Sequence, residues 1–100
     1  MRVLSEKDFL RALGNKEKDF SDVVLHHKSD LRKVEMLENL DFSNAKLCYS
    51  NFSGIIFSNC NLNGTDFTGS NLSNVIVRKN CKKNERTLFG AATLANALIL

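Results

Sequence analysis

The hydrophobic pattern of residues 40–79 repeats every five residues. A large apolar side chain occupies the central position of each unit, and a small or apolar residue stands two positions before it. The other positions hold mostly Asp, Asn, Ser, Thr and Gly. A helix repeats its face every 3.6 residues and a strand every two, so a period of five indicates a repeat architecture. The central residues are Phe42, Leu47, Phe52, Phe57, Leu62, Phe67, Leu72 and Val77.

Each unit is typical of a short extended segment followed by a tight turn. Alternate residues of an extended segment share a face, which places the central residue and the one two before it inside. The second residue after the central one is Gly or Asn in six of the eight units. Both accept the positive φ that the third position of a type II turn requires. If each turn rotates the chain by roughly a right angle, four units close a coil of about 20 residues.

A coil of this length predicts that the sequence resembles itself at a shift of 20 residues. Ser50-Asn-Phe-Ser-Gly-Ile-Ile-Phe57 aligns with Ser70-Asn-Leu-Ser-Asn-Val-Ile-Val77. Stacked central positions then pair a ring with a smaller side chain, as in Phe52 over Leu72, which fills a narrow interior at native density. The pattern therefore predicts stacked coils.

The units Leu40-Asp-Phe-Ser-Asn, Cys60-Asn-Leu-Asn-Gly and Ser70-Asn-Leu-Ser-Asn resemble the pentapeptide repeat family, whose motif is roughly A-(D/N)-L-x-x. The resemblance covers eight clean units with degenerate flanks. It implies an all-β solenoid, a right-handed quadrilateral β-helix, here of about three to four coils with a short N-terminal capping α-helix. Functions within this family are diverse.

Residues 1–100 are expected to form one pentapeptide-repeat domain, with residues 1–17 as its N-terminal helical cap. Ser5 followed by Asp8 resembles a capping box, and Gly14 is a suitable stop for a helix over residues 5–13. The first coil of a solenoid would otherwise expose its interior and strand edges. An alternative is an amphipathic helix that binds a partner. The apolar stripe of this helix contains Leu4, Phe9, Leu10 and Leu13.

Residues 18–79 are predicted to form the coils, with a degenerate first coil at residues 18–37. One extra residue before Leu31 and a second near residues 37–39 keep the columns in phase. This alignment puts Met36 inside, in the column of Phe57, and His26, His27 and Lys28 on a bulged corner. The predicted core ladder is Phe20, Leu25, Leu31, Met36, Phe42, Leu47, Phe52, Phe57, Leu62, Phe67, Leu72 and Val77.

The period fails at Lys82, so residues 80–86 are expected to form a basic loop. Residues 87–100 fit either a partial fourth coil, which we favour, or a terminal helix. Either arrangement leaves an apolar patch, and such patches mark interfaces. We therefore expect a homodimer through this end, as the resemblance also implies, unless the chain continues into a longer solenoid. The predicted interface comprises Leu88, Phe89, Leu94, Leu98, Ile99 and Leu100.

Five cations cluster between residues 78 and 86, with only Glu85 against them. A solvated loop is the favoured interpretation, and contact with nucleic acid or another anionic partner is the alternative. Some members of the family imitate duplex DNA and bind type II topoisomerases. A short chain with a net charge of +3 is poorly suited to that role. The predicted partner-binding residues are Arg78, Lys79, Lys82, Lys83 and Arg86.

No constellation of residues predicts an active site, a metal site or a cofactor site. Cys60 takes an inward position, Cys48 an outward one and Cys81 the loop. Their spacings match no zinc template, which favours reduced structural thiols. The chain has no apolar run of the ~20 residues that a membrane span needs, and its N-terminus lacks the pattern of a signal peptide. We expect a cytoplasmic, non-enzymatic structural or protein-interaction module whose partner the sequence does not identify.

Overall fold

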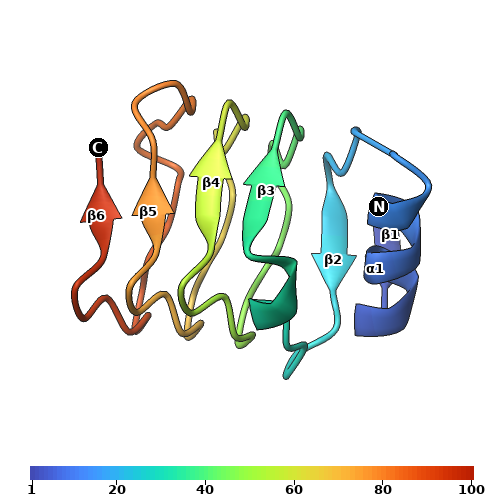
Figure 1. Ribbon diagram of the computed structural model, residues 1–100, viewed down its shortest axis with the longest axis horizontal. Helices are drawn as coiled ribbons and strands as arrows, with labels where there is room; N and C mark the ends of the chain where they lie inside the picture. Colours follow the sequence, from blue (N-terminus) through green and yellow to red (C-terminus); the bar gives the residue numbers. More distant parts are fainter.

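All strands of the protein are short and parallel. The structure, a computed structural model, describes residues 1–100. Strands β3, β4, β5 and β6 form one sheet in that order, and β1 pairs with β2 in a second sheet (Figure 1). The elements are β1 (Arg2–Leu4), α1 (Glu6–Gly14), β2 (Val23–Leu25), the 3₁₀-helix η1 (Arg32–Val34), β3 (Met36–Glu38), β4 (Ile56–Ser58), β5 (Ile76–Val77) and β6 (Leu98–Ile99).

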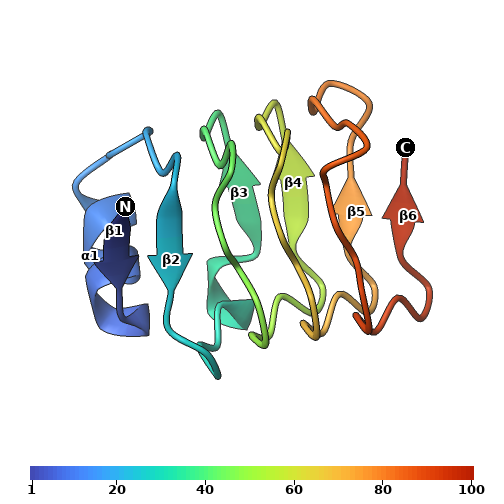
Figure 2. The same cartoon turned by 180° about the vertical axis from the view of Figure 1, so that it is seen from behind.

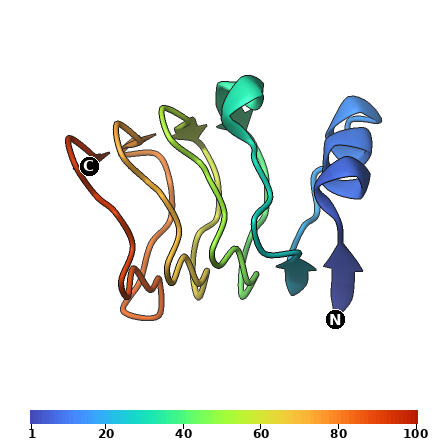
Figure 3. The same cartoon turned by 90° about the horizontal axis from the view of Figure 1, so that it is seen from below.

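Parallel bridges extend this pairing to the other sides of each coil. Three ladders of isolated bridges accompany the sheet of β3 to β6, so the chain stacks in successive coils, numbered coil 1 to coil 4 from the N-terminus (Figure 3). The molecule measures 30 × 25 × 23 Å. We call the four ladders wall 1 (Asp19, Asp41, Asn61, Lys82), wall 2 (Val24, Lys46, Asp66, Leu88), wall 3 (Asp30, Asn51, Asn71, Thr93) and wall 4 (β3 to β6).

The corners use the positive φ that the spacing predicts. Asn44, Asn59 and Asn74 adopt φ of 50–60°, and Gly54, Gly64 and Gly69 adopt φ of 71–78°. At Gly69 the space matters as well, because a Cβ atom there would lie 2.3 Å from Cε1 of Tyr49. Tyr49 also adopts positive φ, and its ring lies 4.9 Å from that of His27 on the adjacent corner.

The core is a continuous stack of rings and aliphatic side chains. The ring centroids of Phe52 and Phe67 are 5.7 Å apart, and Phe57 packs edge-on against Phe67 at the same distance. Of the predicted core ladder, every residue except Met36 is buried.

The predicted inward position of Met36 is wrong. Leu37 pairs with Phe57 and is 1% exposed, whereas Met36 is 37% exposed. The second extra residue of coil 1 lies in η1 and the turn after it, where Glu35 adopts φ of 67°. The spacing from Leu37 to Phe42 is therefore the regular five residues, and no insertion occurs at residues 37–39.

Helix α1 covers the N-terminal end of the stack (Figure 2). The Ser5 hydroxyl accepts a hydrogen bond from the Asp8 N–H at 3.1 Å and begins the helix. The buried Phe9 ring lies 4.9 Å from Phe20 and 6.2 Å from Phe42. Strand β1 pairs with β2 and continues wall 2. The sequence pattern did not predict this short strand.

Residues 80–86 are not simply a loop, which corrects the sequence prediction. The Lys82 N–H donates to the Cys60 carbonyl at 2.9 Å, and Cys81 is 6% exposed. This segment is the wall 1 side of coil 4, and its corners hold the extra residues (the enlarged orange turn in Figure 1).

Residues 87–100 contain no helix and form the other three sides of coil 4. Leu88 and Thr93 form bridges, and β6 pairs with β5. The Phe89 ring stacks on Phe67 with 5.7 Å between the centroids and 6° between the planes. Of the two sequence alternatives, the structure has the partial coil.

Candidate functional site

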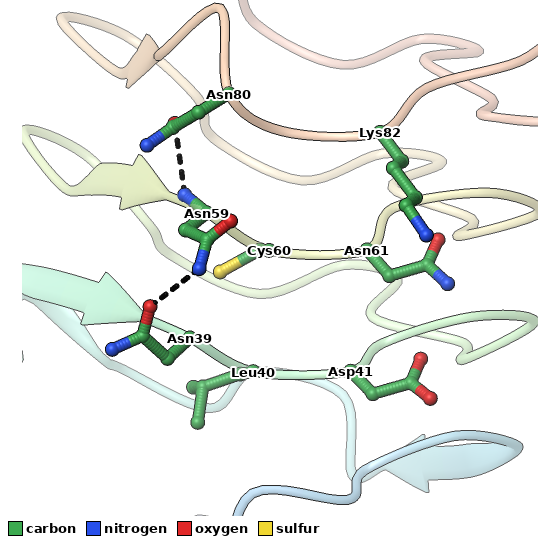
Figure 4. Close-up of a pocket in the computed structure, with 8 residues that line it drawn as sticks. All are labelled: Asn39, Leu40, Asp41, Asn59, Cys60, Asn61, Asn80 and Lys82. Carbon is green, nitrogen blue, oxygen red and sulfur yellow. Dashed lines mark hydrogen bonds between the residues drawn. The ribbon is translucent and has the colours of Figure 1, made fainter.

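Wall 1 carries a shallow polar recess of about 340 Å³ (Figure 4). It forms because the residues on either side of an inward residue point outward along a strand. Asn39, Asn59 and Asn80 line one side of the recess. Asp41, Asn61 and Lys82 line the other side, and Leu40 and Cys60 lie between the two rows.

The amides of the recess are bonded to one another. The Asn59 side chain donates to Asn39 Oδ1 at 2.7 Å, and its backbone N–H donates to Asn80 Oδ1 at 2.9 Å. Asp41 and Lys82 lie two coils apart and form no ion pair. The recess is lined by polar groups but offers no adjacent acid and base.

The outward Asp and Asn side chains of the motif close the turns that follow them. Each accepts the backbone N–H two residues ahead, as in Asp41 with Ser43 at 2.9 Å and Asn51 with Ser53 at 3.0 Å. Burial raises the pKa of Asp66, but the bonds from Thr68 outweigh it and hold that pKa below the ordinary value. The outward Asp and Asn side chains of the motif therefore have a structural role in the turns. The sequence contained the signal for this role in the repeated D/N position.

The small inward residues hold successive coils together. The Thr65 hydroxyl donates to the Phe42 carbonyl at 2.8 Å, and the Ser70 hydroxyl donates to the Leu47 carbonyl at 2.7 Å. Thr87 repeats the bond in coil 4, with 2.6 Å to the Leu62 carbonyl. No buried side-chain nitrogen or oxygen lacks a partner. These hydroxyls are therefore structural groups. The sequence pattern showed only that this position holds small or apolar residues, and it did not reveal the hydrogen bonds.

The three cysteines are free thiols in different surroundings. Cys60 and Cys81 are buried, and Cys48 is half-buried on wall 2 with its Sγ 3.6 Å from the Asp66 carbonyl oxygen. Burial raises the pKa of the Cys60 thiol to about 11 and also raises the pKa of Cys48. Thiols with raised pKa values are poor nucleophiles at neutral pH. No group of three or more His, Cys, Asp or Glu side chains could hold a metal ion.

The five predicted partner-binding cations are distributed along coil 4. Arg78 and Lys79 lie at the corner after β5, Lys82 lies on wall 1, and Arg86 lies at the next corner; all four are exposed. Lys83 occupies the inward position of the Phe42 and Leu62 column, and its Nζ lies 3.4 Å from the Cys81 carbonyl oxygen. None of the five forms an ion pair with Glu85 or any other acid.

The predicted interface residues lie together on the outer side of coil 4. Phe89 is half-buried against Phe67, and the others are 39–53% exposed. In coil 3 the N–H groups of Phe67 and Leu72 donate to coil 4, whereas the equivalent N–H groups of Phe89 and Leu94 have no backbone partner. The edge thus combines apolar side chains with unpaired donors. The exposed side chains are Leu88, Leu94, Leu98, Ile99 and Leu100.

Stacked five-residue units with Asp or Asn closing the turns define a class of repeat protein. The model of the family described as pentapeptide repeats matches eight copies over residues 37–76, so this stretch of the chain consists of pentapeptide repeats. Neither the curated proteins nor the solved structures contain a match to this chain. No helix in the structure is long and apolar enough to cross a membrane.

Proposed function

We propose that the protein is a non-enzymatic structural or protein-interaction module, built as a right-handed quadrilateral β-helix whose sides are the four walls. One contrast within the molecule supports this function. The inward hydroxyls, the thiols and the carboxylates of the motif are bonded to backbone groups, whereas coil 4 has exposed apolar side chains and unpaired donors. Such surfaces mark interfaces.

The partner proposed for this surface is a second copy of the chain, docked end to end through residues 87–100. A symmetric pair would cover both apolar edges at once and leave no edge open to further growth. The alternative is a longer chain, in which a further coil covers the same edge. Such a chain would be monomeric.

The dimer predicts a mass in solution of twice the 11.2 kDa chain mass. Leu98→Asp or Ile99→Asp should shift the protein to monomer, because each places a charge on the apolar edge. Val3→Asp is the matched control, since Val3 is 55% exposed at the opposite end. Light scattering at high micromolar concentration measures the mass. A monomer without precipitation would overturn the dimer.

A second candidate is binding to an anionic polymer, which the unpaired cations of coil 4 favour over an uncharged partner. Because phosphate contacts release counterions, affinity for duplex DNA or RNA should fall steeply as salt rises. The net charge of +3 is opposite in sign to that of duplex DNA, which places DNA mimicry last.

Changing Arg78, Lys79, Lys82 and Arg86 to Ser should abolish such binding and flatten its salt dependence. The control changes Lys7, Arg11, Lys16 and Lys18 to Ser, which removes the same charge from the N-terminal end. Fluorescence anisotropy with labelled duplexes measures the affinity. Absence of binding at low ionic strength, or equal losses in both variants, would exclude this function.

A further inference from the structure

We propose that Cys60 and Cys81 form a redox-sensitive disulfide site that fastens coil 4 to coil 3 in the presence of a low-molecular-weight disulfide such as oxidised glutathione. The site goes beyond the proposed function, because it acts on the placement of coil 4 whichever partner that coil binds.

The register of wall 1 brings the two cysteines together. Lys82 pairs with Asn61, and the Lys82 N–H donates to the Cys60 carbonyl at 2.9 Å. Cys81 and Cys60 are therefore neighbours in the same column, one coil apart. Adjacent strands lie about 4.8 Å apart, within the ~4.4–6.8 Å between Cα atoms that a disulfide accepts.

Both thiols point into the same interior corner. The Cys60 Sγ lies 3.2 Å from the Leu37 carbonyl oxygen, and the Cys81 Sγ lies 3.4 Å from the Phe57 carbonyl oxygen. The Cys81 thiol is close enough to Cys60 to contribute, after burial, to the raised pKa of that thiol. Cys48 lies on wall 2, where its thiol contacts the Asp66 carbonyl instead.

In the closed molecule the pair is protected from oxidants. Cys60 is 2% exposed and Cys81 is 6% exposed, so a glutathione molecule reaches them only when coil 4 opens. Coil 4 is suited to open locally, because it is the outermost layer and places Lys83 where coils 2 and 3 have Phe42 and Leu62. The oxidation rate then reports how often coil 4 opens.

The exchange is balanced. Once coil 4 opens and burial no longer disfavours the ionised thiol, the thiolate of one cysteine attacks a sulfur of oxidised glutathione, which forms a mixed disulfide and releases one glutathione thiolate. The thiolate of the other cysteine attacks the protein sulfur of the mixed disulfide, and the second glutathione thiolate leaves. The two thiol protons pass to the released glutathione. Two protein thiols and one oxidised glutathione thus give one protein disulfide and two reduced glutathione molecules.

The link would hold coil 4 closed. It joins residues in adjacent coils and removes conformations from the opened chain, which stabilises the closed state. Its reduction would again allow the four exposed cations and the apolar edge of coil 4 to move away from coil 3. The site therefore couples the redox state of the surroundings to the presentation of this surface.

The test incubates the full chain in glutathione buffers of increasing oxidised fraction, quenches free thiols by alkylation and maps the disulfides by mass spectrometry. We expect a Cys60–Cys81 link in the wild type and in Cys48→Ser, and none in Cys60→Ser or Cys81→Ser. The linked protein should melt roughly 5–10 °C higher than the reduced one, and dithiothreitol should reverse the shift.

Hydrogen exchange gives a second measurement that does not depend on the variants. Amides of coil 4 such as those of Lys82 and Leu88 should exchange more slowly in the linked wild type than in the reduced one. A link that forms only in denaturant, glutathionylation without an internal link, or a linked protein with unchanged melting and exchange would each overturn the proposal. Light scattering on the linked and the reduced protein measures the dimer independently, so failure of the disulfide proposal can be told apart from failure of the dimer.

Discussion

Phe52→Ala is expected to lower the free energy of unfolding by roughly 3–5 kcal/mol. Phe52 is fully buried in the column between Leu31 and Leu72, and its ring lies 6.1 Å from Phe57 and 5.7 Å from Phe67. Removal of the ring leaves a void in the middle of the stack, where coils on both sides prevent collapse. Urea denaturation followed by circular dichroism measures the loss.

Asn51→Ala is the matched control on the adjacent residue. The Asn51 side chain points outward and accepts one hydrogen bond, from the Ser53 N–H at 3.0 Å. Its loss should cost about 1 kcal/mol or less. Similar losses for the two variants would show that burial in the column does not determine stability at this site.

Leu37→Ala is expected to cost roughly 2–5 kcal/mol, whereas Met36→Ala should cost under about 1 kcal/mol. Leu37 is 1% exposed and packs in the column of Phe57 and Val77, while Met36 is 37% exposed. Both changes shorten an apolar side chain on the same strand, so each variant controls for the other. Urea denaturation measures both losses, and the midpoints of the two variants can be compared directly where their m-values are equal.

The opposite ranking would restore the inward Met36 of the sequence prediction and contradict the observed register. Equal costs would mean that wall 4 tolerates both alignments in coil 1. The pair of variants therefore tests which of Met36 and Leu37 faces the interior, a question that hydrophobicity alone cannot decide.

The error at Met36 has a specific physical origin. A shift of one residue exchanges the inner and outer faces of an extended segment. Met36 and Leu37 are both large and apolar, so either could occupy the interior on grounds of hydrophobicity alone. The tertiary structure decides through the positive φ of Glu35 and the hydrogen bond from the Ile56 N–H to the Glu35 carbonyl at 2.9 Å.

The error at residues 80–86 has a related cause. Lys82 and Lys83 are polar residues where the period requires an inward side chain, and the local sequence therefore predicts a loop. The backbone groups of Lys82 still pair with coil 3, since a bridge depends on N–H and C=O groups and not on side-chain polarity. This pairing is also what places Cys81 beneath Cys60.

The sequence by itself determined the five-residue period, the inward columns of coils 2 and 3, the glycine and asparagine corners and the pentapeptide repeats of residues 37–76. Each of these depends on local chemistry that repeats without interruption, so errors of phase cannot accumulate. Only the tertiary structure decided where coils 1 and 4 absorb their extra residues, that β1 extends wall 2, and which cations, cysteines and apolar side chains meet on coil 4. Those features depend on hydrogen bonds between coils about 20 residues apart, which no local pattern specifies.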